Sequence, residues 1–260
     1  MTNWSLFLFN YGQKLDYKSM SKRAESHIES IAIERERILE EYARRDTEIK
    51  SDLYAPWQSG EILMLAERKR KAALMLHQNG VFPRDEDQCL EIGYGRIGWL
   101  GDLISWEVKE ANIHGIELDA SRAERAKNIL PLADLRVGDA VNLPWEDNKF
   151  KIVIVSTVFS SILDLRIRNL VAGEITRVLA ANGSLLWYDI AVTNPKNHNV
   201  KKISRREIKE LFPLLKGQIK SVTLAPPIAR KIAPVSWVLA SILESIPLFH
   251  THLLAVLHKK

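Results

Sequence analysis

Cysteine is nearly absent from this chain, which limits the chemistry that the protein can perform. The 260 residues contain one cysteine, Cys89, and it lies inside a short apolar run. A disulfide within the chain is therefore excluded, and a small buried side chain is the expected role. The seven histidines have no nearby Cys, Asp or Glu at the spacing typical of metal ligands, so we expect no metal site.

Long apolar runs are also missing. No stretch of about 18 apolar residues occurs, so the sequence predicts no transmembrane helix. The apolar stretch at residues 4–9 is too short for the core of a signal peptide, and no basic residue precedes it. We therefore expect a cytoplasmic protein.

The formal net charge is +5, and the positive charge is unevenly distributed. A solvated helix face and a site for an anionic ligand both account for such a cluster, and the sequence leaves the two open. RNA is a less favoured partner because the sequence has no recognisable RNA-binding module and no aromatic residues between the basic ones. The basic residues within 196–209 are Lys196, Lys201, Lys202, Arg205, Arg206 and Lys209.

The first 78 residues indicate a helical extension. Residues 21–50 are polar with a broken apolar stripe, and residues 61–77 place apolar side chains at helical spacing. Trp57 lies in the loop between these two predicted helices. We expect the extension to dock on the rest of the chain or on a second copy, which would give a homodimer through these helices. The stripe consists of Ile28, Ile31, Ile38, Leu39 and Tyr42.

Predicted strands and helices alternate from residue 79 onward. A strand followed by a helix, repeated along the chain, is typical of a parallel doubly wound sheet. The tail differs, with a short β-prone run, an apolar helix interrupted by Pro234 and a final strand. The expected strands are 88–93, 113–118, 134–137, 150–157, 183–189, 221–224 and 251–258, and the expected helices are 98–108, 121–130, 166–180, 203–212 and 229–245.

The most informative segment is residues 89–98, where an apolar run leads into a Gly-x-Gly-x-x-Gly turn. Gly93 and Gly95 allow a sharp turn and a close approach of the backbone to a ligand. Gly98 begins the next helix, whose N–H groups would point at that ligand. A dinucleotide-binding domain uses the same glycine spacing with an acidic residue about 20 positions later, where Glu117 lies. Glycines that serve only as turn residues are the remaining alternative.

A second segment further along the chain distinguishes these alternatives. It reads Gly138-Asp139-Ala140 and then Leu143-Pro144, before an apolar run that opens at Phe150. In this order the two segments resemble the cofactor-binding motifs of the class I S-adenosylmethionine-dependent methyltransferases. The resemblance covers roughly residues 85–190, and segments near 186–189, 194–197 and 224–230 also resemble a bacterial subgroup of these enzymes.

This resemblance implies an α/β fold: a Rossmann-like, doubly wound seven-stranded sheet with an antiparallel last strand. It also implies S-adenosylmethionine as the cofactor, with residues 79–260 as the methyltransferase domain and residues 1–78 as a helical extension or lid. Glu91 would meet the methionine ammonium group, Glu117 the ribose hydroxyls and Asp139 the adenine amino group. The implied cofactor-binding residues are Glu91, Gly93, Tyr94, Gly95, Gly98, Glu117, Leu118, Asp139, Ala140 and Thr157.

Two residues are candidates for a catalytic base. Methyl transfer depends mainly on holding the acceptor in line with the methyl group, and a base is needed only for an acceptor such as a hydroxyl. Asp189 follows the fifth strand, and His198 lies in the next loop. A cap or loop carboxylate explains Asp189 equally well, and a solvated histidine explains His198. The Asn-Pro-Pro-Tyr and Pro-Cys segments of some nucleic-acid and protein methyltransferases are absent.

The acceptor that we expect is a small molecule or a saccharide with an anionic group, methylated at oxygen. Arg205 and Arg206 follow Ser204, the expected N-cap of a predicted helix, and cations at that position oppose the helix dipole unless an anion joins them. They are the expected acceptor-binding residues, together with Trp57, which alternatively anchors the N-terminal helices. An RNA methyltransferase and a non-catalytic S-adenosylmethionine-binding scaffold are the alternatives.

Overall fold

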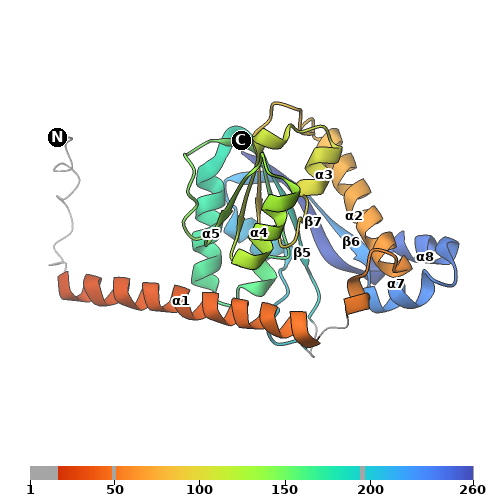
Figure 1. The fold of residues 1–260 in the computed structure, drawn as a ribbon, viewed down its shortest axis with the longest axis horizontal. Coiled ribbons are helices and arrows are strands. Elements are labelled where there is room, and N and C mark those ends of the chain that lie inside the picture. The colour runs from red at the N-terminus through yellow and green to blue at the C-terminus, as the bar shows by residue number, and fades with distance from the viewer. Residues whose placement is uncertain (1–16, 49–50, 194–196, 260) are drawn as a thin grey trace.

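The structure is a computed structural model that describes residues 17–48, 51–193 and 197–259. A seven-stranded sheet forms its centre, in the order β3-β2-β1-β4-β5-β7-β6 (Figure 1). Strands β1 to β5 are parallel, and β7 is antiparallel to both β5 and β6. The expected doubly wound sheet with an antiparallel last strand is therefore confirmed. The strands are β1 (Cys89–Ile92), β2 (Ile113–Glu117), β3 (Asp134–Val137), β4 (Phe150–Ser156), β5 (Leu179–Ile190), β6 (Leu215–Leu224) and β7 (His250–Lys259).

Helices cover both faces of the sheet. On one face, Val171 of α5 and Ile208 of α6 join the first core cluster. On the other face, Met75 of α2, Leu103 of α3 and Ala126 of α4 join the second cluster, so α2 shares a core with the sheet. The helices are α1 (Tyr17–Glu48), α2 (Ser59–Gln78), α3 (Leu100–Ser105), α4 (Ala120–Ile129), α5 (Leu165–Val178), α6 (Arg205–Leu211), α7 (Pro226–Ile232) and α8 (Trp237–Glu244).

The strands feed these two cores alternately, because successive side chains of a strand point to opposite faces. In β5, Leu185 and Trp187 belong to the first core, whereas Leu186 and Tyr188 belong to the second. This explains why the central strands are continuous apolar runs instead of alternating apolar and polar residues.

The carboxyl ends of β1 to β5 meet at one edge of the sheet, since these strands are parallel. Strand β6 runs in the same direction as β5, because β7 is antiparallel to both. The α7–α8 segment that follows β6 therefore lies at this carboxyl edge as well. Helix α1 runs along the same end of the molecule (Figure 1). Ligands of open α/β sheets collect at this edge.

Four elements differ from the sequence-based expectations. The expected helix over 166–180 ends at Val178, because Leu179 already pairs with Phe150 of β4, and β5 therefore begins at Leu179 instead of 183. Strand β6 begins at Leu215 instead of 221. It is the edge strand and pairs only with β7, so its first half can be polar and gives no apolar run in the sequence. The single helix expected over 229–245 is two helices, because Pro234 cannot continue a helix and Ser236 caps α8. Within the described ranges, no helix is both long and apolar enough to cross a bilayer.

Candidate active site

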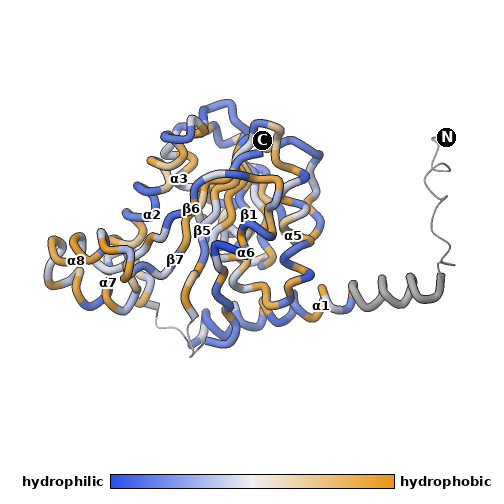
Figure 2. Tube along the Cα trace, turned by 180° about the vertical axis from the view of Figure 1, so that it is seen from behind, coloured by the Kyte–Doolittle hydropathy of each residue, from blue (hydrophilic) through white to orange (hydrophobic). Residues whose placement is uncertain are grey.

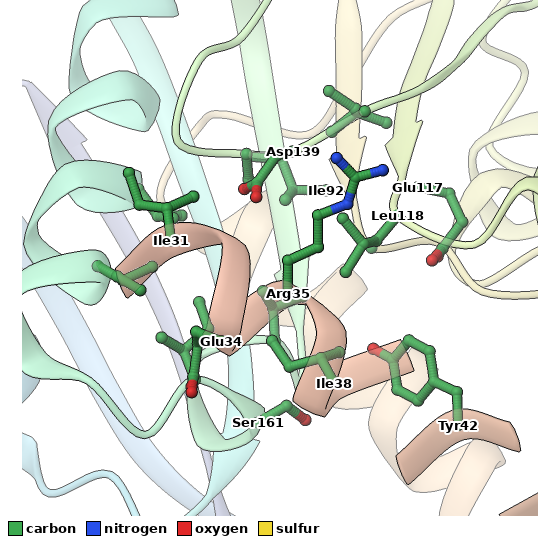
Figure 3. A pocket seen from close by; sticks show the side chains of 18 residues that line it. Ile31, Glu34, Arg35, Ile38, Tyr42, Ile92, Glu117, Leu118, Asp139 and Ser161 are labelled. Carbon is green, nitrogen blue, oxygen red and sulfur yellow. The ribbon is translucent and has the colours of Figure 1, made fainter. Parts of the chain in front are cut away.

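A cavity opens at the carboxyl edge, between the sheet and α1 (Figure 3). The space between its atoms is about 590 Å³ with the open mouth included. The ends of β1, β2 and β3, the loop after β4, helix α5 and helix α1 all contribute side chains. Five of the residues expected to bind cofactor line this cavity, namely Gly93, Glu117, Leu118, Asp139 and Ala140.

The glycine turn after β1 forms one wall. Gly93 has φ +69°, and a Cβ there would lie 2.6 Å from Val158 Cγ2, so only glycine fits. Its N–H donates to the carbonyl of Ile116 at 2.8 Å, which ties the turn to β2. Gly95 has φ +59°, and a Cβ added there would have no neighbouring atom within 4 Å, so its left-handed backbone is what requires glycine.

Glu117 ends β2 and joins the glycine turn to the cavity. One carboxylate oxygen accepts the Gly95 N–H at 2.7 Å, and the other accepts the Asp119 N–H at 3.0 Å. An ionised carboxylate has about four acceptor positions, so two are left for a ligand. Two hydroxyl groups on neighbouring carbons would match this pair of free positions.

Asp139 lies beyond the end of β3, on the same cavity. Its carboxylate accepts the Val141 N–H at 3.1 Å, which holds the side chain in a tight turn and leaves further acceptor positions. Ile116, Leu118 and Ala140 supply apolar surface between Asp139 and Glu117. A flat apolar group with a polar rim would fit between these two carboxylates.

Helix α1 closes the other side of the cavity, a role that the sequence indicated only through its apolar stripe. Ile31 and Ile38 of that stripe line the cavity. Arg35 lies between them in sequence, and Figure 3 shows its side chain extending from α1 into the space bordered by Asp139 and Leu118. Arg35 was not among the expected site residues, because a charged residue beside an apolar stripe normally faces water. Glu34 and Tyr42 complete this wall.

Polar contacts hold α1 on the domain. The Glu34 carboxylate accepts the Leu163 N–H, and the Arg37 guanidinium donates to the Ser161 carbonyl. The guanidinium of Arg122 lies 4.2 Å from the centre of the Tyr42 ring. Burial and the charge of Glu117 raise the pKa of Tyr42 to about 12, so this phenol keeps its proton at the cavity wall.

Glu91 does not lie where the sequence predicted. Its side chain is 1% exposed and does not line the cavity. The carboxylate accepts the Trp99 N–H at 2.7 Å and packs against Gly98, where a Cβ would lie 2.2 Å from Oε1. Burial raises the pKa of Glu91 to about 8. The structure therefore shows Glu91 anchoring the turn to the start of α3 from beneath the cavity.

Tyr94, Gly98 and Thr157 also lie outside the cavity lining. Tyr94 is 1% exposed, and its ring occupies the space above Gly115 of β2, because β2 has no side chain there. Gly98 has φ +46° and provides room for Glu91. Thr157 has φ +55° and donates its N–H to the Tyr188 carbonyl at 2.8 Å, at the end of β4. These three residues shape the backbone around the site.

Asp189 is buried behind the cavity wall, in contrast to its expected catalytic position. It is 1% exposed and accepts the N–H groups of Ser160 at 3.0 Å and Ile190 at 2.8 Å. Burial raises its pKa to about 6. Ser160 neighbours Ser161, which lines the cavity. The geometry assigns Asp189 to holding the loop after β4.

The expected acceptor-binding residues lie away from the cavity. Arg205 donates to the Ile219 carbonyl and to Ser221 Oγ, which ties α6 to β6, and the 88%-exposed Arg206 pairs with Glu210 at 2.7 Å. Ser204 caps α6, as its sequence predicted, by accepting the Glu207 N–H. Their local partners thus explain both arginines without an anion. Trp57 is 69% exposed and lines no cavity described here.

His198 is exposed, and its loop lies close to the site. Asn199 and Val200 line a small second cavity with Tyr42 and Ser161, which also border the first. The Lys201 N–H donates to the Ser160 carbonyl at 2.9 Å. The loop after β5 therefore packs against the loop after β4. Among the described residues, no group of three or more His, Cys, Asp or Glu side chains could hold a metal ion.

Known proteins share this architecture. A family model described as a methyltransferase domain matches residues 90–187. The demethylmenaquinone methyltransferase of Thermotoga maritima is 28% identical over 150 residues, which are 58% of this chain and 61% of that protein. The chain thus matches less than two thirds of the length of that relative.

Two solved structures share the fold at low sequence identity. A putative sarcosine dimethylglycine methyltransferase from Galdieria sulphuraria has a TM-score of 0.55 and 15% identity, over 74% of this chain and 85% of that one. A geranyl diphosphate C-methyltransferase from Streptomyces coelicolor has a TM-score of 0.54 and 14% identity, over 72% and 75%. Residues 90–187 thus match a methyltransferase domain, and the glycine turn and strand order agree with the Rossmann-like fold of these structures, so the chain is similar to the class I S-adenosylmethionine-dependent methyltransferases.

Proposed function

We propose that this protein transfers a methyl group from S-adenosylmethionine, which it binds in the cavity between the sheet and α1. The observation that carries the proposal is the pair of carboxylates, Glu117 and Asp139, on one cavity beside the glycine turn. The free acceptor positions of Glu117 suit the ribose diol, and Asp139 suits the adenine amino group. The cofactor supplies an electrophilic methyl group on a sulfonium, and the chain positions the acceptor and excludes water.

Arg35 is the proposed contact on the α1 side of the cofactor. A guanidinium stacks well on a flat aromatic ring, and the Arg35 side chain enters the space between the two carboxylates. We propose that residues 1–78 form an N-terminal extension, in which α1 is a lid and α2 packs into the core of the sheet, and that residues 79–260 form the methyltransferase domain. A homodimer through the N-terminal helices is a separate proposal, supported by the exposed Ile28 and Ile33 on α1. Equilibrium sedimentation measures it directly.

The acceptor that we propose is a small molecule with an anionic group, methylated at oxygen. Since Arg205 and Arg206 have local partners, the cations that support this proposal are Lys201 and Lys202. Both are exposed on the segment whose backbone contacts the loop after β4. His198, on the same segment, is the proposed base for a hydroxyl acceptor. The proposed location is the cytoplasm.

A lipid-like quinone is a second candidate acceptor. The match to the demethylmenaquinone methyltransferase of Thermotoga maritima favours it, since its 150 aligned residues are 58% of this chain. Incubating the protein with S-adenosylmethionine and separate pools of polar and lipid metabolites distinguishes the two candidates. The mass of the methylated product identifies the acceptor, and release of S-adenosylhomocysteine measures turnover.

A matched pair of variants tests the acceptor residues once the acceptor is known. Lys201→Ala with Lys202→Ala should raise the acceptor KM about tenfold, which corresponds to about 1.4 kcal/mol of lost binding, and leave cofactor affinity unchanged. Arg206→Ala is the control, because Arg206 is an exposed cation away from the cavity that pairs with Glu210. Equal effects of the two changes would reject a specific anion contact. The absence of any S-adenosylhomocysteine from either pool would reject the enzymatic proposal.

A further inference from the structure

The segment between β6 and β7 exposes an apolar surface that methyl transfer in the cavity does not explain. We name residues 235–248 the apolar tip; they comprise α8 and the two turns that flank it. At its ends, Val235 is 84% exposed and Leu248 is 85% exposed. Figure 2 shows α8 as a hydrophobic element that projects from one end of the molecule. Five further large apolar side chains of the tip are exposed: Trp237, Val238, Leu239, Ile242 and Ile246.

Helix α8 is apolar on both of its faces. Its inner face packs on the domain, where Ala240 and Leu243 join the cluster formed with Leu63 of α2. Its outer face presents Val238 and Ile242, one turn apart, to solvent. A helix that is hydrophobic all round is normally buried, and a contiguous exposed apolar patch marks an interaction site. The outer face of α8 therefore lacks the partner that its sequence requires.

The charges of the segment indicate which partner this is. Glu244 is the only acidic residue between 225 and 249, and it is 8% exposed and paired with Arg70 of α2. The basic residues Arg230 and Lys231 end α7; Arg230 pairs with Glu61 of α2 at 2.7 Å, and Lys231 is exposed. Across residues 225–249, all of which the structure describes, the exposed surface thus carries apolar side chains and the cation of Lys231 without an exposed carboxylate. This combination complements a bilayer surface with anionic headgroups.

The shape of the tip supports the same partner. Its two most exposed side chains lie in turns at either end of a short helix, so they can enter the boundary between headgroups and acyl chains without unfolding α8. Trp237 carries an apolar ring with one polar N–H, which suits that boundary. The tip also follows β6, so it lies at the same carboxyl edge of the sheet as the cavity.

We propose that the apolar tip docks this protein on the surface of a bilayer that contains anionic lipids, with the carboxyl edge of the sheet toward the membrane. The inference goes beyond the proposed methyl transfer and does not depend on it. Docking in this orientation would hold the cavity beside the bilayer, where a lipid-borne acceptor could reach it.

Flotation of the full-length protein with lipid vesicles tests the proposal. Phosphatidylcholine vesicles that contain phosphatidylglycerol should carry the protein, and vesicles of phosphatidylcholine alone should carry less of it. Val235→Ser with Leu248→Ser should lower the partition coefficient at least about tenfold, because the variant has lost two aliphatic side chains whose transfer from water into the bilayer favours binding. Lys231→Ala should lower it about fivefold on the anionic vesicles only.

A matched double variant controls for the loss of aliphatic surface. Leu132 is 70% exposed and Leu214 is 67% exposed, and they precede β3 and β6 at the opposite edge of the sheet. Leu132→Ser with Leu214→Ser should leave vesicle binding unchanged. Thermal unfolding verifies that both double variants fold.

Three results would overturn the proposal. The wild-type protein could bind neither type of vesicle, or the two double variants could bind equally well. The third result is a wild-type dimer in light scattering that becomes a monomer when Val235 and Leu248 are replaced. In that case a second copy of the chain covers the outer face of α8.

Discussion

The backbone N–H of Gly95 donates a 2.7 Å hydrogen bond to the carboxylate of Glu117. This contact joins the turn after β1 to the end of β2, and both segments border the cavity. Because a charged acceptor strengthens the bond, the turn is held in one conformation before any ligand binds. The same carboxylate thus organises the backbone and faces the proposed cofactor.

Replacing Glu117 should weaken cofactor binding. Glu117→Ala removes the acceptor for the ribose diol and for the Gly95 N–H, so we expect a loss of about 2 kcal/mol or more in affinity for S-adenosylhomocysteine. Titration calorimetry measures it. Glu146→Ala is the control, since Glu146 is an exposed glutamate outside the cavity lining. Unchanged affinity in Glu117→Ala would remove Glu117 from the proposed site.

Gly93 and Gly173 should respond in opposite ways to alanine. At Gly93 a Cβ would lie 2.6 Å from Val158 Cγ2 at φ +69°, so Gly93→Ala should cost about 1–3 kcal/mol of stability. At Gly173, inside α5, no atom lies within 4 Å of the added Cβ, so Gly173→Ala should stabilise the protein by up to about 1 kcal/mol. Urea unfolding measures both. Equal stability of the two variants would contradict the geometry of the turn.

Burial of Glu91 predicts a pH-dependent loss of stability. Its pKa rises from 4.5 to about 8 on folding, so between these values the native state binds more protons than the unfolded state. Stability from this group therefore falls as pH rises through that range, and the loss is complete above the folded pKa. Glu91→Gln keeps an acceptor for the Trp99 N–H but carries no charge.

The melting temperature of Glu91→Gln should accordingly rise relative to wild type when the pH increases from about 5 to about 9. Differential scanning fluorimetry at several pH values measures the difference. A constant difference would mean that the pKa of Glu91 is not raised on folding, so that this carboxylate is ionised in the folded protein throughout this pH range. Cofactor affinity should be similar in both proteins at neutral pH, because Glu91 lies outside the cavity lining.

Removing α1 should open the cavity without unfolding the sheet. A chain that lacks residues 1–50 loses the wall formed by Ile31, Arg35, Ile38 and Tyr42, which exposes Ile116 and Leu118 to water. We expect weaker cofactor binding and lower solubility, with the far-ultraviolet circular dichroism of the sheet retained. A truncated protein with wild-type affinity, solubility and activity would reject the proposed lid.

The parts of the fold that the sequence predicts well depend on local chemistry. The glycine turn follows from residues that need a positive φ, and the buried strands follow from short apolar runs between turn signals. Glu117 and Asp139 could be placed at one edge because parallel strands all end there. The same reasoning identified Ser204 as the cap of α6, since a cap contacts only its own helix.

The roles that only the tertiary structure decided depend on neighbours distant in the sequence. Glu91 precedes the glycine turn as expected, but packing beneath Gly98 and Trp99 buries it. Arg205 begins α6 as expected, but its guanidinium donates a hydrogen bond to the Ile219 carbonyl of β6. Arg35 lies beside an apolar stripe, and only the docking of α1 directs it into the cavity. The order of residues in the sequence determined which groups reach the carboxyl edge of the sheet. Tertiary packing decided which of these groups face the cavity, because the burial and the hydrogen-bond partners of a side chain depend on elements that are distant in the sequence.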